Sequence, residues 1–270
     1  MSIQTEIERI KNNLLTAYEK AASKGANIPA IKNSSNLPNT IDTIKEEGPE
    51  TSWWNKRTKN NTDWTGVFSW SPDNTLLSEL DSSKVTELDH AFYASKNSSI
   101  PQFNFSSVIN AKNCFNTSSI LNLPDLNFPK LKSMESFIGS NSKVQTIGTL
   151  DTPNCTNFKN AFSFCTALTK IVGINLTSAV SEEDYSSYYN PLYYIFYYDK
   201  ALSDITFNGN INASLDLSPC PLTHASALSA INALGETTSV KVLKLKSTTM
   251  QTLTEEEKNI AVSKGWTLVE

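Results

Sequence analysis

The chain has 270 residues, an apolar share of 39% and a net charge of −4, with an isoelectric point near 5.4. This length allows one large domain, or a medium domain with smaller attachments. The sequence has neither a basic stripe nor a run of about 18 apolar residues, so we expect no nucleic-acid partner and no membrane insertion.

Apolar residues recur near the N-terminus in steps of four and three. This spacing matches the a and d positions of a coiled coil, and Ile at both positions shifts the preference toward trimers or tetramers. We therefore predict that residues 1–47 form an oligomerisation or attachment segment, with a homotrimer as the expected state. The alternative is an amphipathic helix docked on its own chain. The predicted seam begins with Ile3, Ile7, Ile10 and Leu14 and continues with Ala17 and Ala21.

The first six residues, Met-Ser-Ile-Gln-Thr-Glu, are polar and acidic. They lack the apolar core of a secretory signal peptide, so we expect a protein made in the cytoplasm.

Four cysteines and two histidines are spread along the chain without a Cys-x-x-Cys pair. A zinc site needs closely spaced soft ligands, so we predict no metal and no cofactor. The simpler interpretation is that the cysteines are small, buried apolar residues in a reduced protein. These residues are Cys114, Cys155, Cys165, Cys220, His90 and His224.

A repeated phenylalanine organises the middle of the chain, and a similar ladder of apolar positions follows each copy. A unit of about 25 residues cannot bury its own apolar face, so stacked neighbours must bury it. We predict repeats over 84–212, each a short helical turn, a polar loop and a short strand, with the phenylalanines in one continuous spine. The repeated residues are Phe92, Phe115, Phe137, Phe162 and Phe196.

Stacked repeats expose their core at both ends and need caps. Residues 48–83 hold four of the five Trp, Trp53, Trp54, Trp64 and Trp70, and we predict a linker and an N-terminal cap there. An aromatic ligand patch is the alternative. Residues 213–270 read as an α/β cap: a helix from 223 to 234, a strand at 240–245, a capping box from Thr254 to Glu257, and a last strand at 266–269.

Motifs for catalysis are missing from the sequence. There is no Gly-rich phosphate loop, no G-x-S-x-G and no H-E-x-x-H. The acidic run from Glu182 to Asp184 is better interpreted as a solvated loop than as a glycosidase pair, and His224 as the start of a helix. We predict that the protein is not an enzyme.

Seven of the nine tyrosines lie in the last and longest repeat, from Tyr185 to Tyr198. Tyrosine offers a large contact area and a hydroxyl at low entropic cost, so it is favoured at recognition surfaces. We predict a binding site at Tyr185, Tyr188, Tyr189 and Tyr193. The alternative is that half of the tyrosines pack around Phe196.

The repeats resemble BspA-type leucine-rich repeats, with the theme V-x-x-M-x-x-M-F-x-x-C-x-x-L-x-x-L. Residues 157–171, Asn-Phe-Lys-Asn-Ala-Phe-Ser-Phe-Cys-Thr-Ala-Leu-Thr-Lys-Ile, match it most closely, while the other units are degenerate. The resemblance covers about 84–212. It implies an α/β fold: a leucine-rich-repeat-type solenoid with an N-terminal coiled-coil-like helix and an α/β C-terminal cap.

Both ends resemble segments of leucine-rich repeat proteins from tailed-phage and prophage structural modules. The matching stretches are 28–44, with an L-P-x-x-I-x-x-I pattern, 218–224 and 253–268. This resemblance implies a virion structural protein of a phage tail, associated with the tail fibre or baseplate. It would attach to other tail or baseplate proteins through 1–47 and recognise a host cell-surface glycan or protein. A bacterial surface adhesin of BspA type is the alternative.

Overall fold

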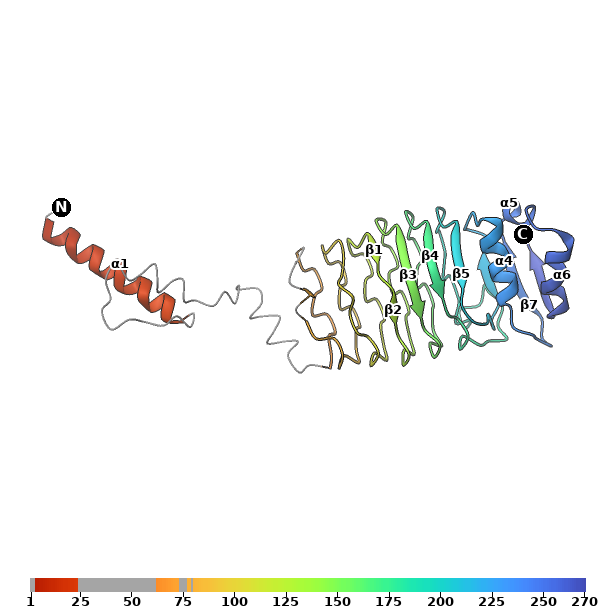
Figure 1. The fold of residues 1–270 in the computed structure, drawn as a ribbon, viewed down its shortest axis with the longest axis horizontal. Helices are drawn as coiled ribbons and strands as arrows, with labels where there is room; N and C mark the ends of the chain where they lie inside the picture. Colours follow the sequence, from red (N-terminus) through yellow and green to blue (C-terminus); the bar gives the residue numbers. More distant parts are fainter. Residues whose placement is uncertain (1–2, 24–61, 73–76, 79) are drawn as a thin grey trace. The chain divides into compact units, whose positions relative to one another are not determined.

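The computed structural model describes residues 3–23, 62–72, 77–78 and 80–270, with side chains from residue 12 onward (Figure 1). The chain divides into two compact units, residues 1–56 and 57–270, and each is considered by itself. The described part is mixed α/β, with parallel sheets and few helices. No helix in it is both long and apolar enough to span a membrane.

The first unit contains the helix α1 (Ile3–Ser23), which confirms the helix expected from the apolar spacing. Leu14 is half-buried, while Tyr18 and Ala21 are buried within a single copy of the chain. Burial within one copy is what the docked-helix alternative expects. The side chains of Ile3, Ile7 and Ile10 lie outside the described residues, so the coiled coil stays a prediction.

The second unit winds in successive turns that pair side by side in parallel. Single-residue bridges connect Asp63, Glu87, Asn110, Ser133 and Asn157 in that order. The sequence numbers of successive partners differ by 24, 23, 23 and 24, so each turn of chain is laid on the previous one in nearly constant register. The pairing already includes Asp63, which lies within the segment 48–83 predicted as linker and cap.

A parallel sheet forms along another edge of the later turns (Figure 1). One turn contributes the two short strands β1 and β2, and each of the next three turns contributes one strand. Its order is β1-β3-β4-β5, with β2 also paired to β3. Alternate residues of β5 point inward and are buried, as expected for strands that cover a core on one face. The strands are β1 (Asn122–Leu123), β2 (Leu126–Asn127), β3 (Thr146–Asp151), β4 (Lys170–Ile174) and β5 (Asp204–Phe207).

A column of large side chains runs through the centre of the turns, one from each. The rings of Phe68 and Phe92 stack at 4.8 Å, those of Phe92 and Phe115 at 5.1 Å, and those of the last pair at 5.4 Å. All members are fully buried, which removes their apolar surface from water. This central column consists of Phe68, Phe92, Phe115, Ile138, Phe162 and Phe196.

The predicted spine is wrong at Phe137, because Ile138 holds that place in the column. The Phe115 N–H donates to the Phe137 carbonyl and the Ile138 N–H to the Ala161 carbonyl, which sets Ile138 beside both Phe115 and Phe162. Phe137 is also buried, but its ring meets that of Phe115 edge-on, at 89°. With Ile138 in the column, the spacing between successive members becomes nearly even on both sides of this turn.

Each turn has two residues with left-handed backbone, two positions before and two after its column residue. A positive φ suits the third residue of a type II turn, where glycine or asparagine is preferred. Here one of the twelve positions is glycine, and several carry bulky side chains. The pairs are Gly66 and Trp70, His90 and Ala94, Asn113 and Thr117, Ser136 and Ser140, Asn160 and Phe164, and Tyr194 and Tyr198, with φ between 51° and 69°.

Polar side chains close the start of most turns. An oxygen of Asp63, Asn110, Ser133 and Asn157 accepts a hydrogen bond from the backbone N–H two residues later. Such local bonds hold a turn in one conformation. They occur at the bridge positions themselves, so they help to fix the register between turns.

Helices replace the polar turns at the C-terminal end. A second parallel sheet, in the order β6-β7-β8, accompanies them. The predicted helix, strand, capping box and last strand are confirmed, whereas β6 and α5 were not predicted. The elements are β6 (Leu215–Leu217), α4 (His224–Ala233), β7 (Lys241–Leu245), α5 (Ser247–Met250), α6 (Glu255–Ser263) and β8 (Trp266–Val269).

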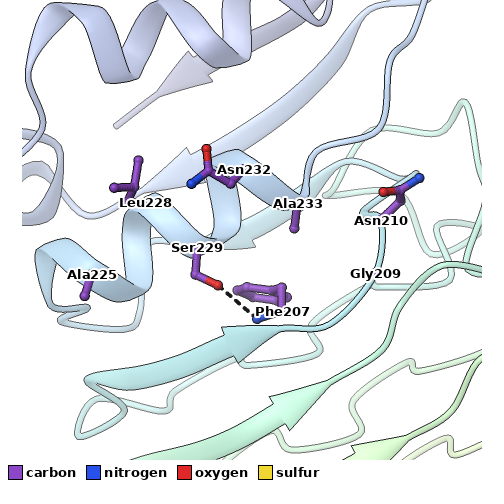
Figure 2. A pocket seen from close by; sticks show the side chains of 8 residues that line it. All are labelled: Phe207, Gly209, Asn210, Ala225, Leu228, Ser229, Asn232 and Ala233. Atoms are coloured by element: carbon purple, nitrogen blue, oxygen red, sulfur yellow. Dashed lines mark hydrogen bonds between the residues drawn. The ribbon is translucent and has the colours of Figure 1, made fainter.

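The helix α4 covers the edge of β5. The hydroxyl of Ser226 accepts a hydrogen bond from the Ile205 N–H at 2.9 Å. The hydroxyl of Ser229 accepts one from the Phe207 N–H at 3.1 Å (Figure 2). A buried backbone N–H without a partner would cost stability. The two serines therefore let the five-stranded sheet end inside the protein.

Candidate aromatic recognition site

The candidate site is a cluster of aromatic side chains on the outside of the turn that contains Phe196. The rings of Tyr193 and Tyr194 stack with centroids 4.0 Å apart, and those of Tyr194 and Tyr197 at 4.4 Å. Tyr198 stacks on Phe164 of the preceding turn at 5.4 Å. We call the following residues the aromatic cluster: Phe164, Tyr188, Tyr189, Tyr193, Tyr194, Tyr197 and Tyr198.

The backbone explains why these rings face outward. Leu192, Ile195 and Phe196 are buried in the core, and the left-handed conformation of Tyr194 and Tyr198 turns their side chains to the surface. Tyr194, Tyr197 and Tyr198 are exposed, and Tyr193 is half-exposed. These four tyrosines thus lie at the surface and do not pack around Phe196, as the alternative expected for half of the tyrosines.

The loop before this turn adds the two most exposed rings. Tyr188 is 61% exposed and Tyr189 is 79% exposed, and Tyr188 meets Tyr193 edge-on at 5.7 Å. The buried side chain of Asn190 orders the loop, because its Nδ2 donates to the carbonyl oxygens of Glu183, Asp184 and Ser214. The exposed rings thus sit on a loop with a fixed anchor.

Two lysines lie against faces of the cluster. The Nζ of Lys159 is 4.3 Å from the ring centre of Tyr188, and that of Lys200 is 3.9 Å from the ring centre of Tyr198. An ammonium group is attracted to the negative face of an aromatic ring. A hydrogen bond with Tyr194 raises the pKa of Tyr193, so this phenol stays neutral at physiological pH.

Three of the four predicted binding residues, Tyr188, Tyr189 and Tyr193, belong to this cluster. Tyr185 is half-buried, and its ring lies 5.5 Å from the Nζ of Lys244 in β7. Among the described residues it makes none of the ring contacts that join the cluster. The prediction missed Phe164, Tyr194, Tyr197 and Tyr198. Correct repeat alignment would have found one link, since Phe164 and Tyr198 occupy the same position of neighbouring turns.

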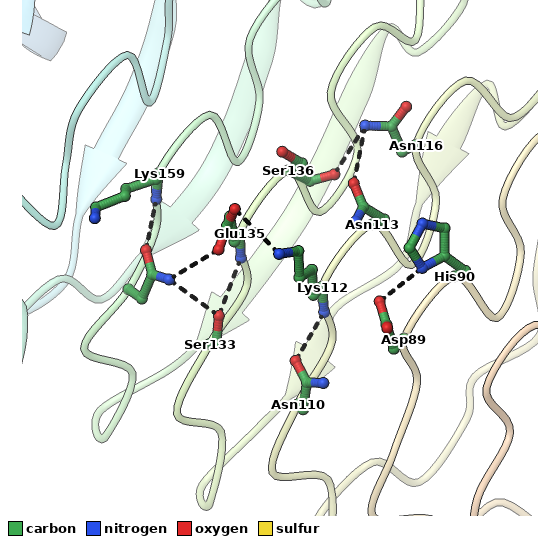
Figure 3. Close-up of polar contacts among 11 residues, drawn as sticks. Asp89, His90, Asn110, Lys112, Asn113, Asn116, Ser133, Glu135, Ser136 and Lys159 are labelled. Atoms are coloured by element: carbon green, nitrogen blue, oxygen red, sulfur yellow. Dashed lines mark hydrogen bonds and ion pairs between the residues drawn. The ribbon is translucent and has the colours of Figure 1, made fainter. Parts of the chain in front are cut away.

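In earlier turns, polar side chains occupy repeat positions that aromatic side chains occupy in the turn of Phe196 (Figure 3). Lys112 forms an ion pair with Glu135 at 3.3 Å, and Asn157 donates to the Glu135 carboxylate. His90 and Asp89 are joined at 2.8 Å. We call the following residues the polar ladder: Asp89, His90, Lys112, Asn113, Asn116, Glu135, Ser136, Lys159 and Asn160.

A second, smaller aromatic group lies near the first turns. The ring of Tyr93 is 5.3 Å from that of His90 and 5.8 Å from that of Trp70. Trp70 is 70% exposed, whereas Trp64 is fully buried against Phe68. The predicted cap thus holds one core tryptophan and one surface tryptophan, and Trp53 and Trp54 lie outside the described residues.

The remaining reactive side chains have structural surroundings. All four cysteines are buried and free, and burial raises the pKa of the Cys155 thiol to about 12, far from a reactive thiolate. His224 begins α4, and its Nε2 lies 3.0 Å from the Glu257 carboxylate, whose pKa this contact lowers. Within the described part of the chain, no three His, Cys, Asp or Glu side chains gather as a metal site would require.

A shallow groove of about 620 Å³ lies between the end of β5 and α4 (Figure 2). Its lining is neutral and combines the apolar side chains of Phe207 and Leu228 with small or polar residues such as Ala225, Ser229 and Asn232. No titratable side chain lines it, so it offers no acid or base for catalysis. The aromatic cluster is the stronger candidate for function.

Stacked parallel turns with polar corners place the chain in the class of repeat proteins. Its sequence matches the family described as "Mycoplasma protein of unknown function, DUF285" over residues 37–145 and 62–173, which together span half of the chain, and the chain belongs to this family. The family occurs in mycoplasma and BspA-like repeat proteins, which agrees with the BspA-type repeats. No curated protein and no solved structure matches the chain.

Proposed function

We propose that this chain is a non-enzymatic structural protein of a phage tail that recognises a host cell surface through its aromatic cluster. The stacked turns form a leucine-rich-repeat-type solenoid, and the solenoid displays the cluster. The observation that carries the recognition role is the group of seven touching aromatic side chains, six of them more than a third exposed.

The physical case for recognition is the cost of leaving these rings in water. A contiguous group of exposed large apolar side chains is rare on a monomeric surface and marks binding sites. The rings here are held by stacking and by the anchored loop of Asn190, so little entropy is lost when a ligand binds. A preorganised surface of this kind suits repeated encounters with a partner.

Attachment to other tail or baseplate proteins is assigned to the N-terminal segment. It belongs to the first of the two compact units, and the helix α1 spans the residues of the predicted seam. The phage context itself rests on the resemblance of 28–44 and of the C-terminal segments to phage structural proteins. The seam predicts a homotrimer.

A BspA-type bacterial surface adhesin is the second candidate, and the family match favours it. Both candidates use the same recognition surface and differ in whether the protein is attached to a phage tail or to a bacterial cell. The neighbouring genes separate them: tail and baseplate genes support the first, and cell-wall genes the second.

The recognition role is tested by binding of the fluorescently labelled full chain to a panel of intact bacterial cells. The variant combines Tyr188→Ser, Tyr189→Ser and Tyr194→Asn, since asparagine tolerates the left-handed backbone at position 194. We expect this variant to lose binding with an unchanged melting temperature. The matched control is Tyr185→Ser, outside the cluster. Equal binding of the triple variant and the control contradicts the proposal.

The oligomeric state is measured separately by light scattering of the full chain. A homotrimer has about three times the chain mass of 29.8 kDa. We expect Ile7→Asp with Ile10→Asp to convert it to monomers, because charges in an a/d seam oppose association. A wild-type monomer contradicts the coiled-coil attachment and leaves the recognition role standing.

A further inference from the structure

We infer that the ligand of this surface is a neutral polysaccharide, which lies across the turns from the aromatic cluster along the polar ladder to Tyr93 and Trp70. The inference rests on the proposed recognition function and adds the chemistry and the length of the ligand. Three properties of the surface lead to it: its charge balance, its mixture of rings and amides, and its closed backbone.

The described charged side chains of this surface are of both signs. Lys112 forms an ion pair with Glu135, and Asp89 is hydrogen-bonded to His90. The ammonium groups of Lys159 and Lys200 lie over tyrosine rings. A polyanion such as a nucleic acid or an acidic glycan needs a row of free cations, and the described residues of this surface do not present one. The ligand that fits is uncharged.

The side chains present two kinds of contact along the turns, with aromatic rings at both ends and polar groups between them. Rings of the aromatic cluster and of Tyr93 offer flat apolar faces and edges, which suit the C–H faces of sugar rings. Between these two groups lie half-exposed amides and hydroxyls, at Asn113, Asn116, Ser136 and Asn160. These groups donate and accept hydrogen bonds, as the hydroxyls of a sugar require.

The backbone argues against an extended peptide as the ligand. In the turns that carry the polar ladder, alternate N–H groups bond to the carbonyls of the next turn, such as Leu88 to Asn110 and Ala111 to Ser133. A peptide that adds to a sheet needs an edge with free backbone groups. Recognition on this surface therefore depends on side chains.

The two aromatic groups are far apart, and this predicts the length of the ligand. Tyr93 and Tyr197 follow the column residues Phe92 and Phe196, which are four turns apart. With strands spaced about 4.8 Å apart in a parallel sheet, the separation is about 19 Å. A ligand that touches both groups must contain several sugar units in a row.

The test uses the full chain and the cells that it binds. Cells are treated with periodate, which cleaves the vicinal diols of sugars, or with protease, and binding is also compared at low and high salt. We expect periodate to abolish binding and protease to leave it unchanged. Because the ligand is neutral, added salt should also leave binding unchanged.

Protease-sensitive binding overturns the inference in favour of a protein receptor, and binding lost at high salt overturns it in favour of an acidic glycan. Both of these outcomes leave the proposed recognition function standing. If the chain binds none of the cells, the proposed function itself fails, and the inference fails with it.

The span of the ligand is tested with variants at the far end. We expect Tyr93→Ser and Trp70→Asn each to weaken cell binding about tenfold, against Tyr185→Ser as the control. The exposed Trp70 can change without disturbing the core, so a folding defect of the Tyr93 variant would not hide the result. Full binding by the Trp70 variant overturns the span from cluster to first turns.

Discussion

The rings of Phe162 and Phe196 stack nearly parallel with their centroids 5.4 Å apart, although a whole turn and an inserted loop separate them in the chain. This is the longest separation in sequence between neighbouring members of the central column. The additional segment belongs to the loop that ends at Asn190 and carries Tyr188 and Tyr189. The core thus keeps its register while the surface gains an aromatic loop, which connects the packing of the turns to the candidate site.

The central column predicts a large loss of stability for Phe162→Ala. This ring is fully buried between neighbouring turns, so its truncation should leave a cavity and cost about 3–5 kcal/mol. Urea denaturation followed by circular dichroism measures the change. Phe164→Asn, on the same turn but 44% exposed, is the control and should shift stability by about 0.5 kcal/mol or less. Equal losses at both positions would contradict the column.

The left-handed positions predict a stabilising substitution at Thr117. This exposed, β-branched residue has a φ of 55°, a conformation that costs an L-residue about 1–2 kcal/mol and glycine little. We expect Thr117→Gly to raise the free energy of unfolding by about 1 kcal/mol. Thr166→Gly, at an exposed position without positive φ, should lower it. A loss of stability at Thr117 similar to that at Thr166 would count against the repeated backbone pattern.

Asp199 predicts a dependence of stability on pH. The carboxyl is fully buried, its Oδ1 accepts a hydrogen bond from the Cys165 N–H at 2.8 Å, and its Oδ2 has no partner within the described residues. Burial raises its pKa from 3.8 to about 8. The folded protein therefore holds a proton that the unfolded chain releases, and stability should fall as pH rises from about 4 to about 8.

Asp199→Asn replaces this carboxyl by a neutral group of the same shape. The variant should lose most of the decline in stability between about pH 5 and pH 8, measured as the melting temperature at each pH. Asp151→Asn changes an exposed carboxyl and is the control. If the Asp199→Asn variant kept the full decline, other groups would have to be responsible.

The sequence predicted the repeats because each buried phenylalanine leaves a large side chain at a nearly fixed interval. It could not identify Ile138 as the column residue, since Phe137 is the larger neighbour and both are buried. The backbone supplied the missing signal: Ser136 and Ser140 have positive φ at the two positions that flank Ile138. A serine in the sequence does not indicate a positive φ. The register between degenerate repeats is set by packing between neighbouring turns, which the sequence of a single repeat does not show.

The candidate site was predicted in its composition but only partly in its members. Tyrosine enrichment indicated the segment that forms most of the aromatic cluster, and Tyr188, Tyr189 and Tyr193 lie in this cluster. Tyr194 and Tyr198 were missed because their outward direction follows from left-handed backbone. The sequence predicts an exposed Tyr185, whereas this side chain is half-buried and its ring lies 5.5 Å from the Nζ of Lys244. The C-terminal helices and strands were predictable, because the Thr254–Glu257 capping box and Gly265 mark local boundaries.

The most direct test of the account is a footprint of the tyrosines in the bound state. The full chain is nitrated free and bound to cells, and the modified tyrosines are identified by mass spectrometry. The account predicts that Tyr188, Tyr189 and Tyr194 are nitrated in the free protein and protected when bound, while Tyr185 is modified equally in both. Binding without protection of these three tyrosines would contradict the aromatic cluster as the recognition site.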